Sequence, residues 1–276
     1  MKLNLGNVTS QKQEQAFDKI NLKMKNMQKA KILAAFMLAQ LVLLFLACGK
    51  EQSDGHVTIH LDHEVAGQPL DFDEIKYNSK AGHPYSVARL KYYVSNVVLH
   101  EANGNVIEVA GVHYRDAAEA DTRSFTSGKV PIGTYDRVSF IYGLDETTNV
   151  DGGLPNTQTN INMEWPIPGD QGYHYMKLEG KYDSLASGVI KNFNLHTGAA
   201  MGNQNFIEVS LPLSPFTVDG NTWGITLVMD INEWLENPNT WDFEAYGPMI
   251  MMNQNAQEVL KANGATVFKI GKVEKE

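Results

Sequence analysis

The sequence has a single cysteine, Cys48, among its 276 residues. One thiol cannot form an internal disulfide, and no C-x-x-C metal or redox motif is present. The motifs G-x-S-x-G, G-x-x-x-x-G-K-[ST], G-x-G-x-x-G and H-E-x-x-H are also missing. The sequence therefore lacks the marks of serine hydrolases, P-loop nucleotidases, dinucleotide enzymes and zinc proteases. We expect a protein that is not an enzyme.

Positive charge is scarce outside the N-terminal segment. Residues 1–47 hold seven lysines and two acids, so that residues 48–276 carry a net charge of −14 within a chain whose total is −9. Nucleic-acid binding requires clustered cations to contact phosphates. The acidic remainder therefore argues against a nucleic-acid partner. It is compatible with cation binding, although an acidic surface more often serves solubility alone.

The longest apolar run, residues 32–47, is short for a membrane span and typical of a signal peptide. Four lysines precede it: Lys23, Lys25, Lys29 and Lys31. It ends in Phe45-Leu46-Ala47-Cys48-Gly49, which resembles a bacterial lipobox. We expect a lipid on Cys48, the alternatives being an uncleaved anchor or a free thiol. The chain then divides into an N-terminal extension with a lipoprotein signal peptide (1–47), the lipidated cysteine with a polar tether (48–55) and one domain (56–276). This predicts an exported lipoprotein, anchored in the bacterial cell envelope at the periplasm or outer membrane.

Long helical patterns and internal repeats are absent after residue 56. Instead, apolar and polar residues alternate with period two, which indicates half-buried strands. Asn103-Gly104-Asn105 marks a hairpin turn. Short helical turns are expected around Trp234, and one helix over 253–262 that ends at Gly264. Together these signals predict an all-β fold, a single β-sandwich domain with short helices. The expected strands cover approximately 56–63, 88–100, 106–109, 136–143, 172–180, 189–196, 205–213, 222–231 and 266–270.

Three of the histidines in these expected strands are relevant to a possible metal site. His63 has the parity of the apolar residues in its strand and should point inward, either as a hydrogen-bonded core histidine or as a metal ligand. His196 follows Leu195 and should lie on the opposite face, or on the turn that follows. His174 is expected to share a face with Met176.

Trp165 stands before a Pro/Gly turn within the stretch Met163 to Gly180. It is either a core tryptophan at the edge of the sandwich or part of a metal site. The same stretch holds three acids, Glu164, Asp170 and Glu179. Two carboxylates at a suitable separation would define a glycoside hydrolase, but the sequence does not give their separation.

Two further segments suggest metals. Residues 149–152, Asn-Val-Asp-Gly, resemble part of a calcium loop, but Thr147 stands where the first Asp belongs and Gln158 replaces the bidentate Glu. We therefore expect a plain loop and no calcium. Residues 248–252, Pro-Met-Ile-Met-Met, form a possible soft-metal cluster, which we interpret instead as the entry to the following helix.

Seven segments span nearly the whole domain: VTIHLDHEVAGQPL (57–70), RLKYYVSNVVLH (89–100), VPIGTYDRVSFIYGLDETTN (130–149), MEWP (163–166), GYHYMKLEG (172–180), FNLHTG (193–198) and NGATVFKIG (263–271). In this order they resemble the MbnP-like family of exported copper-binding proteins. The phrases YYVSN and GYxYMKLEG are the most specific parts of the match.

The resemblance implies a copper ion held by two histidines and a tryptophan that has been oxidised to kynurenine. By matched motif these are His63, His196 and Trp165. Two neutral imidazoles and an aryl amine suit Cu(I), whereas an unmodified indole can only donate a hydrogen bond. The family also implies a dihaem, peroxidase-like partner enzyme for the oxidation. The chain departs from the family pattern at Glu164 and Ile167, where relatives usually carry aromatic residues.

Two functions follow from these observations. The first is a cell-envelope lipoprotein that binds copper, as Cu(I), through two histidines next to a tryptophan, for copper acquisition or buffering. The alternative is a metal-free surface module on the same sandwich. It would bind a glycan or a protein through exposed aromatic residues, namely Trp165, Tyr173, Tyr175 and Trp223.

Overall fold

The computed structural model describes residues 23–25, 27, 53–166 and 172–276. The chain divides into two units, residues 1–51 and 52–276. In the first unit, Lys23–Lys25 and Met27 are helical, and the predicted signal run 32–47 and Cys48 lie outside the described residues. Among the described residues, no helix is both long and apolar enough to cross a membrane.

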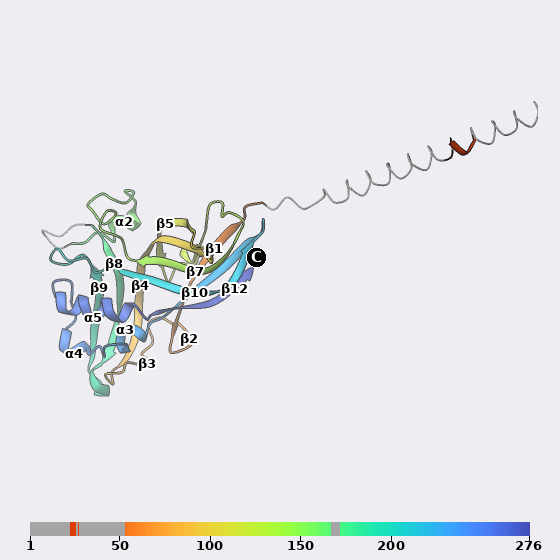
Figure 1. The fold of residues 1–276 in the computed structure, drawn as a ribbon. Coiled ribbons are helices and arrows are strands. Elements are labelled where there is room, and N and C mark those ends of the chain that lie inside the picture. Colours follow the sequence, from red (N-terminus) through yellow and green to blue (C-terminus); the bar gives the residue numbers. More distant parts are fainter. Residues whose placement is uncertain (1–22, 26, 28–52, 167–171) are drawn as a thin grey trace, which may run out of the picture. The chain divides into compact units, whose positions relative to one another are not determined.

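The second unit is built from two β-sheets with an apolar core, which confirms the predicted all-β sandwich (Figure 1). The five-stranded sheet has the order β12-β11-β1-β2, and β6 pairs with β1. Its strands are β1 (His56–Val65), β2 (Gln68–Pro69), β6 (Ser124–Thr126), β11 (Thr222–Asp230) and β12 (Phe268–Lys275).

The seven-stranded sheet has the order β10-β7-β4-β8-β9, and β3 and β5 also pair with β4. Its longest strand, β4, is buried at successive positions over 85–87 and 92–95, where both of its faces are covered. The strands are β3 (Tyr77–Asn78), β4 (Pro84–Glu101), β5 (Val106–Asp116), β7 (Gly133–Tyr142), β8 (His174–Asp183), β9 (Ile190–Gly198) and β10 (Ile207–Val218). Because β9 is the edge strand, its free side is open to other segments.

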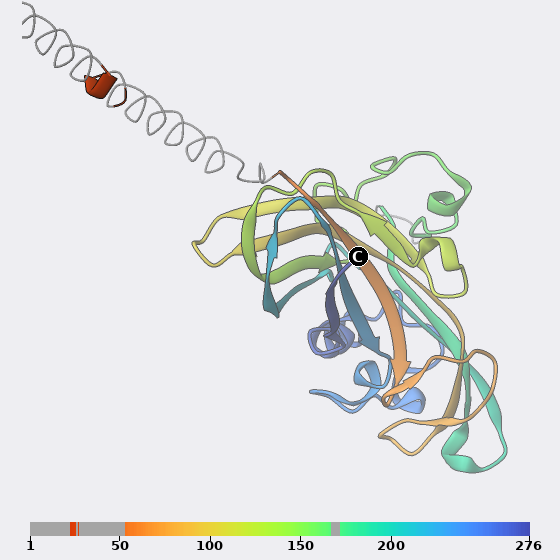
Figure 2. The ribbon, with the colours of Figure 1, turned by 90° about the vertical axis from the view of Figure 1, so that its right-hand side faces the viewer.

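Alternation along the strands supplies the main core. Val57, Ile59 and Leu61 of β1 are fully buried, as the period-two pattern predicts. β1 runs parallel to β11, with His56 opposite Thr222 and Glu64 opposite Asp230 (Figure 2). This pairing joins segments that are more than 150 residues apart in the sequence.

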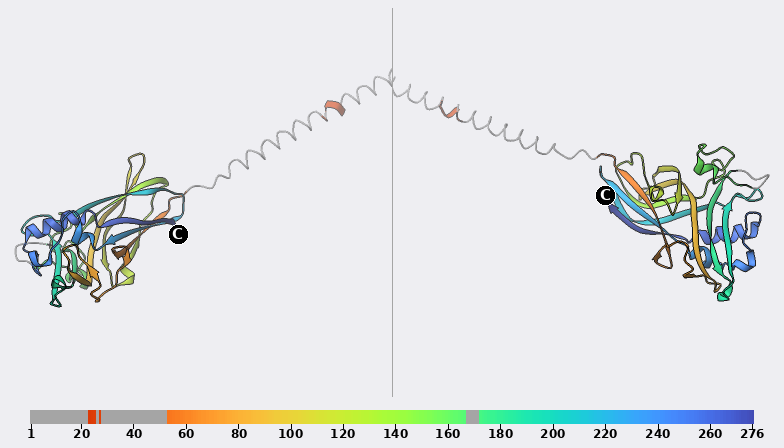
Figure 3. Two further views of the ribbon diagram at one scale, coloured as in Figure 1. Left: turned by 90° about the horizontal axis from the view of Figure 1, so that it is seen from below. Right: turned by 180° about the vertical axis from the view of Figure 1, so that it is seen from behind.

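The helices are short and gather at the end of the domain away from the C-terminus (Figure 3). The longest, α5 (Gln254–Gly264), begins with Asn253, whose side chain accepts a hydrogen bond from the Ala256 amide. It ends at Gly264, as predicted. The other helices are η1 (Ala120–Thr122), α2 (Gln158–Ile161), η2 (Ser184–Ala186), α3 (Glu233–Glu236) and α4 (Phe243–Tyr246).

The segment between β7 and β8 folds over the outer face of the seven-stranded sheet. There it buries a second apolar cluster, which includes Tyr93, Tyr173 and Tyr175. Its polar side chains hold the segment's own backbone: Asn149 accepts a hydrogen bond from the Tyr173 amide and Asp151 one from the Gly172 amide. The side chains that suggested a calcium loop therefore serve the turn. No group of three or more metal-binding acids, histidines or cysteines occurs in the part of the chain that the structure describes.

Candidate metal centre

A β-bulge in β8 brings His174 to the outer face of the seven-stranded sheet. His174 is paired with Gly198 and Met176 with Thr197, so two residues of β8 oppose one of β9 at this point. The prediction that His174 shares a face with Met176 is therefore wrong. Met176 packs in the main core, whereas His174 contacts His196 on the other side of the sheet.

The hydrogen bond of the His174 ring identifies its tautomer. Nδ1 lies 2.9 Å from the carbonyl oxygen of Met163, which can only accept, so Nδ1 carries the hydrogen. Burial, with the cation of Lys177 next in importance, lowers the pKa of His174 to about 3. The ring is therefore neutral near pH 7, and Nε2 carries a lone pair. This nitrogen is buried and has no hydrogen-bond partner within the described residues.

His196 is oriented by a carboxylate. Its Nε2 lies 2.8 Å from Oε1 of Glu179, and Nη1 of Arg89 lies 2.6 Å from Oε2 of the same group. Burial alone would raise the pKa of Glu179, but the hydrogen bonds from His196 and Arg89 lower it to about 2. An ionised carboxylate can only accept, so His196 donates through Nε2. A ring that donates through Nε2 can offer a metal only Nδ1, in the manner of carboxylate–histidine pairs that orient metal ligands.

The two imidazoles lie close enough to share one metal ion. Their ring centroids are 5.0 Å apart, and the rings are nearly perpendicular, at 86°. Because metal–nitrogen bonds are about 2.0 Å long, two nitrogens on one ion are separated by no more than about 4 Å. Rings at this separation can meet that limit. The unpartnered Nε2 of His174 is the observation that fits a metal, since a buried imidazole nitrogen normally has a hydrogen-bond partner.

The Trp165 ring packs against the His174 ring of this pair. Its ring centroid is 4.8 Å from that of His174, and only 6% of the residue is exposed. The indole lies directly over Gly198, where an added Cβ would come within 2.5 Å of two ring carbons. The Trp165 amide donates to the carbonyl of Gly172, a residue with φ of 83°, which favours glycine. Trp165 and Glu164 also line a cavity of about 310 Å³.

The structure does not bring His63 to this pair. His63 points inward, as predicted, and its Nε2 lies 3.0 Å from the hydroxyl of Tyr92. Tyr92 occupies the same cross-strand row as Met176 and Thr197, on the core face. His196 precedes Thr197 and lies on the opposite face. The seven-stranded sheet therefore separates His63 from His196.

The other predicted sites find little support in the described residues. Trp165, Tyr173 and Tyr175 are buried, and Trp223 packs partly against the main core, so these four do not form an exposed aromatic platform. Among the acids proposed for glycoside hydrolysis, Glu179 is held as a carboxylate by its two partners. Asp170 lies outside the described residues.

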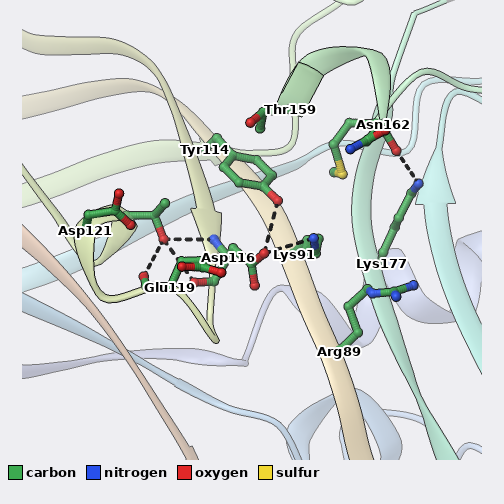
Figure 4. A pocket seen from close by; sticks show the side chains of 11 residues that line it. Arg89, Lys91, Tyr114, Asp116, Glu119, Asp121, Thr159, Asn162 and Lys177 are labelled. Carbon is green, nitrogen blue, oxygen red and sulfur yellow. Dashed lines mark hydrogen bonds and ion pairs between the residues drawn. The ribbon is translucent and has the colours of Figure 1, made fainter. Parts of the chain in front are cut away.

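A polar cavity of about 560 Å³ lies beside β8, with Lys177 and Asn162 in its lining (Figure 4). Lys177, which pairs across the strands with His196, points into it and donates to the Asn162 carbonyl at 2.6 Å. Lys91 stands directly opposite Lys177 in the sheet and forms an ion pair with Asp116 at 2.9 Å. Figure 4 shows these lysines near one wall and two acids, Glu119 and Asp121, on the other.

The domain also matches a known family over most of its length. The MbnP family model matches residues 54–253, well over half of the chain. The chain belongs to the MbnP family. This confirms the resemblance noted in the sequence. A solved structure similar to this MbnP-family chain is that of MbnP from Methylosinus trichosporium, with 14% sequence identity and a TM-score of 0.47, covering 80% of this chain and 98% of that one. No curated protein matches the chain.

Proposed function

We propose that this MbnP-family protein binds copper, as Cu(I), through His174 and His196 beside Trp165, and that it serves copper acquisition or buffering rather than catalysis. The observation that carries the proposal is the buried Nε2 lone pair of His174. This nitrogen has no hydrogen-bond partner among the described residues and its ring lies against the ring of His196.

The donor set favours Cu(I) over the common alternatives. Imidazole nitrogen suits copper, zinc, iron and nickel, whereas calcium and magnesium take oxygen ligands. Structural zinc takes four protein ligands, and catalytic zinc takes three with a water. The pair supplies two imidazole nitrogens beside the indole of Trp165, which suits a monovalent soft ion of low coordination number. Copper would be held by His174 and His196, and Glu179 would keep the ring of His196 in place.

Trp165 would shield the ion in its unmodified form, since an indole N–H has no lone pair to offer. A dihaem, peroxidase-like partner, which the family resemblance implies, would have to oxidise Trp165 before this residue could act as a ligand. We also propose that a lipid on Cys48 anchors the protein in the cell envelope. An intact mass of the protein isolated from its membrane would report lipid, tryptophan oxidation and retained copper together.

The test is a Cu(I) titration of the purified protein against a chromophoric chelator under reducing conditions. The parent protein should bind one equivalent tightly, and His174→Gln or His196→Gln should abolish tight binding. His63→Gln should retain the full equivalent, because His63 lies across the sheet. His100→Gln is a matched control, since its imidazole contacts Ser139 elsewhere in the same sheet. Full binding by the His174→Gln and His196→Gln variants would overturn the proposal.

A metal-free binding role is the second candidate, and one observation favours it. Lys91 and Lys177 are directly opposite each other in the sheet, an arrangement that is unfavourable unless anions neutralise it. Asp116 neutralises Lys91, and burial lowers the pKa of Lys177. A small carboxylate bound in the cavity beside Lys177 would supply the anion for this second lysine. Calorimetric titration with short mono- and dicarboxylates, with Lys177→Met as the negative control, tests this role.

A further inference from the structure

The methionine segment 248–252 lies along the edge strand β9. Met249 forms a parallel bridge with Asn194, and the Asn194 amide donates to the carbonyl of Pro248 at 3.0 Å. The free edge of β9 is therefore covered at this point by the methionine segment. The segment leads into α5, as predicted, but this role does not account for its side chains.

Gln257 ties the segment to one of the proposed copper ligands. Its side chain is fully buried, and its amide nitrogen donates to the carbonyl of His196 at 2.8 Å and to that of Ile250 at 3.2 Å. One side chain thus holds the backbone of His196 and the backbone of the methionine segment together. The methionine segment is therefore fixed to the backbone of the edge strand that carries His196.

The sulfur-containing side chains of the segment are more exposed than its isoleucine. Ile250, which has no sulfur, is fully buried. Met249 and Met252 are each 70% exposed, and Met251 is partly exposed. The Asn253 amide donates to the Ile250 carbonyl at 2.9 Å, which closes a turn with Met251 and Met252 at its centre. Three of the four consecutive residues 249–252 therefore carry a flexible thioether that reaches the surface, and the buried residue among them is Ile250.

Thioether sulfur is a soft ligand that selects Cu(I) over zinc, calcium and magnesium. It is also neutral, so it binds Cu(I) without the deprotonation that a thiol requires. Methionine is flexible, with three rotatable bonds, so neighbouring sulfurs can converge on one ion. Surface packing alone does not require sulfur at these positions, because leucine would cover the same area.

We propose that Met249, Met251 and Met252 form a surface thioether site that collects Cu(I) and passes it to His174 and His196. The inference rests on the copper function proposed above. The transfer is a ligand exchange: copper–sulfur bonds break as copper–nitrogen bonds form, and the ion stays Cu(I), so that no electron or proton donor is required.

The thioether site is tested first in a protein that lacks the histidine pair. The double variant His174→Gln/His196→Gln, with ¹³C-methyl-labelled methionine, is titrated with Ag(I), a redox-inert substitute for Cu(I). The methyl signals of the three surface methionines should shift, whereas those of the buried Met176 and Met229 should not. Zn(II) should shift none of them. Unshifted surface methyl signals with Ag(I) would overturn the proposal, whatever the histidine pair binds.

The transfer is tested in the triple variant Met249→Leu/Met251→Leu/Met252→Leu, which keeps the apolar volume and removes the sulfurs. In stopped-flow loading from a weak Cu(I) complex, the histidine pair should fill several-fold more slowly than in the parent protein. The final copper stoichiometry and the thermal unfolding temperature should be unchanged. A loading rate equal to that of the parent would refute the delivery role. Loss of copper from the parent protein itself would instead point to failure of the proposed function.

Discussion

His63 should make the domain lose stability as the pH falls from 7 to 5. Burial, with the cation of Arg115 next in importance, lowers the pKa of His63 to about 3. In the unfolded chain the pKa of a histidine is about 6.5. Between these values only the unfolded chain binds the proton, so the stability contributed by His63 is fully present above about pH 6.5 and is lost as the pH falls towards 3. At about 1.4 kcal/mol per pH unit, the step from pH 7 to pH 5 costs about 2 kcal/mol for this residue.

The assay is urea unfolding of the metal-free protein at pH 7 and at pH 5. His63→Gln should reduce the difference between the two free energies of unfolding by about 2 kcal/mol, since glutamine does not titrate. Tyr92→Phe is the matched control: it removes the hydroxyl 3.0 Å from Nε2 but keeps the buried imidazole, so the difference should persist. If His63→Gln shows the same pH 7 to 5 difference as the parent, His63 does not stay neutral in the fold and the reasoning fails.

Three further changes probe the candidate metal centre. Gly198→Ala should destabilise the domain by about 1–3 kcal/mol in thermal unfolding, because the new methyl group overlaps the Trp165 ring; an unchanged melting temperature would contradict this. Glu179→Gln should weaken Cu(I) binding about 10- to 100-fold in chelator competition, because the charge that orients His196 is lost; equal affinity would mean that Glu179 does not support the ligand. Gln257→Leu should cost about 1–3 kcal/mol by leaving buried carbonyl groups without donors, and should speed hydrogen exchange near His196; unchanged exchange there would argue against the clamp.

The alternation of apolar and polar residues in the sequence was sufficient to predict the longer strands. The pattern over 56–63 matches β1, and both the burial of Leu61 and the inward direction of His63 follow from it. The strands β2, β3 and β6 have only two or three residues, too few to show a period. The hairpin at Asn103-Gly104-Asn105 was also predictable, since its turn residues are local.

The candidate metal centre was only partly predictable, because its geometry depends on one extra residue. Counting every second position from Met176 puts His174 in the core, but the bulge at Tyr175 reverses its direction. The run Tyr173 to Met176 is buried at four successive positions, a break in alternation that signals cover on both faces. The inward direction of His63 was correct. However, alternation within one strand does not show how the two sheets are arranged. The separation of His63 from His196 by the seven-stranded sheet could therefore not be predicted from the sequence.

The parallel pairing of β1 with β11 has a consequence for when the domain can form. A chain that emerges N-terminus first presents residues 56–65 long before residues 222–230, and until then β1 has only the short strands β2 and β6 beside it. Contacts of such large sequence separation form slowly, because closing the intervening loop costs entropy before any pairing is gained. β1, the first strand of the domain, can therefore pair with β11 only after nearly the whole domain has emerged. The five-stranded sheet therefore stays incomplete through most of the chain's emergence, which is consistent with the export that we propose.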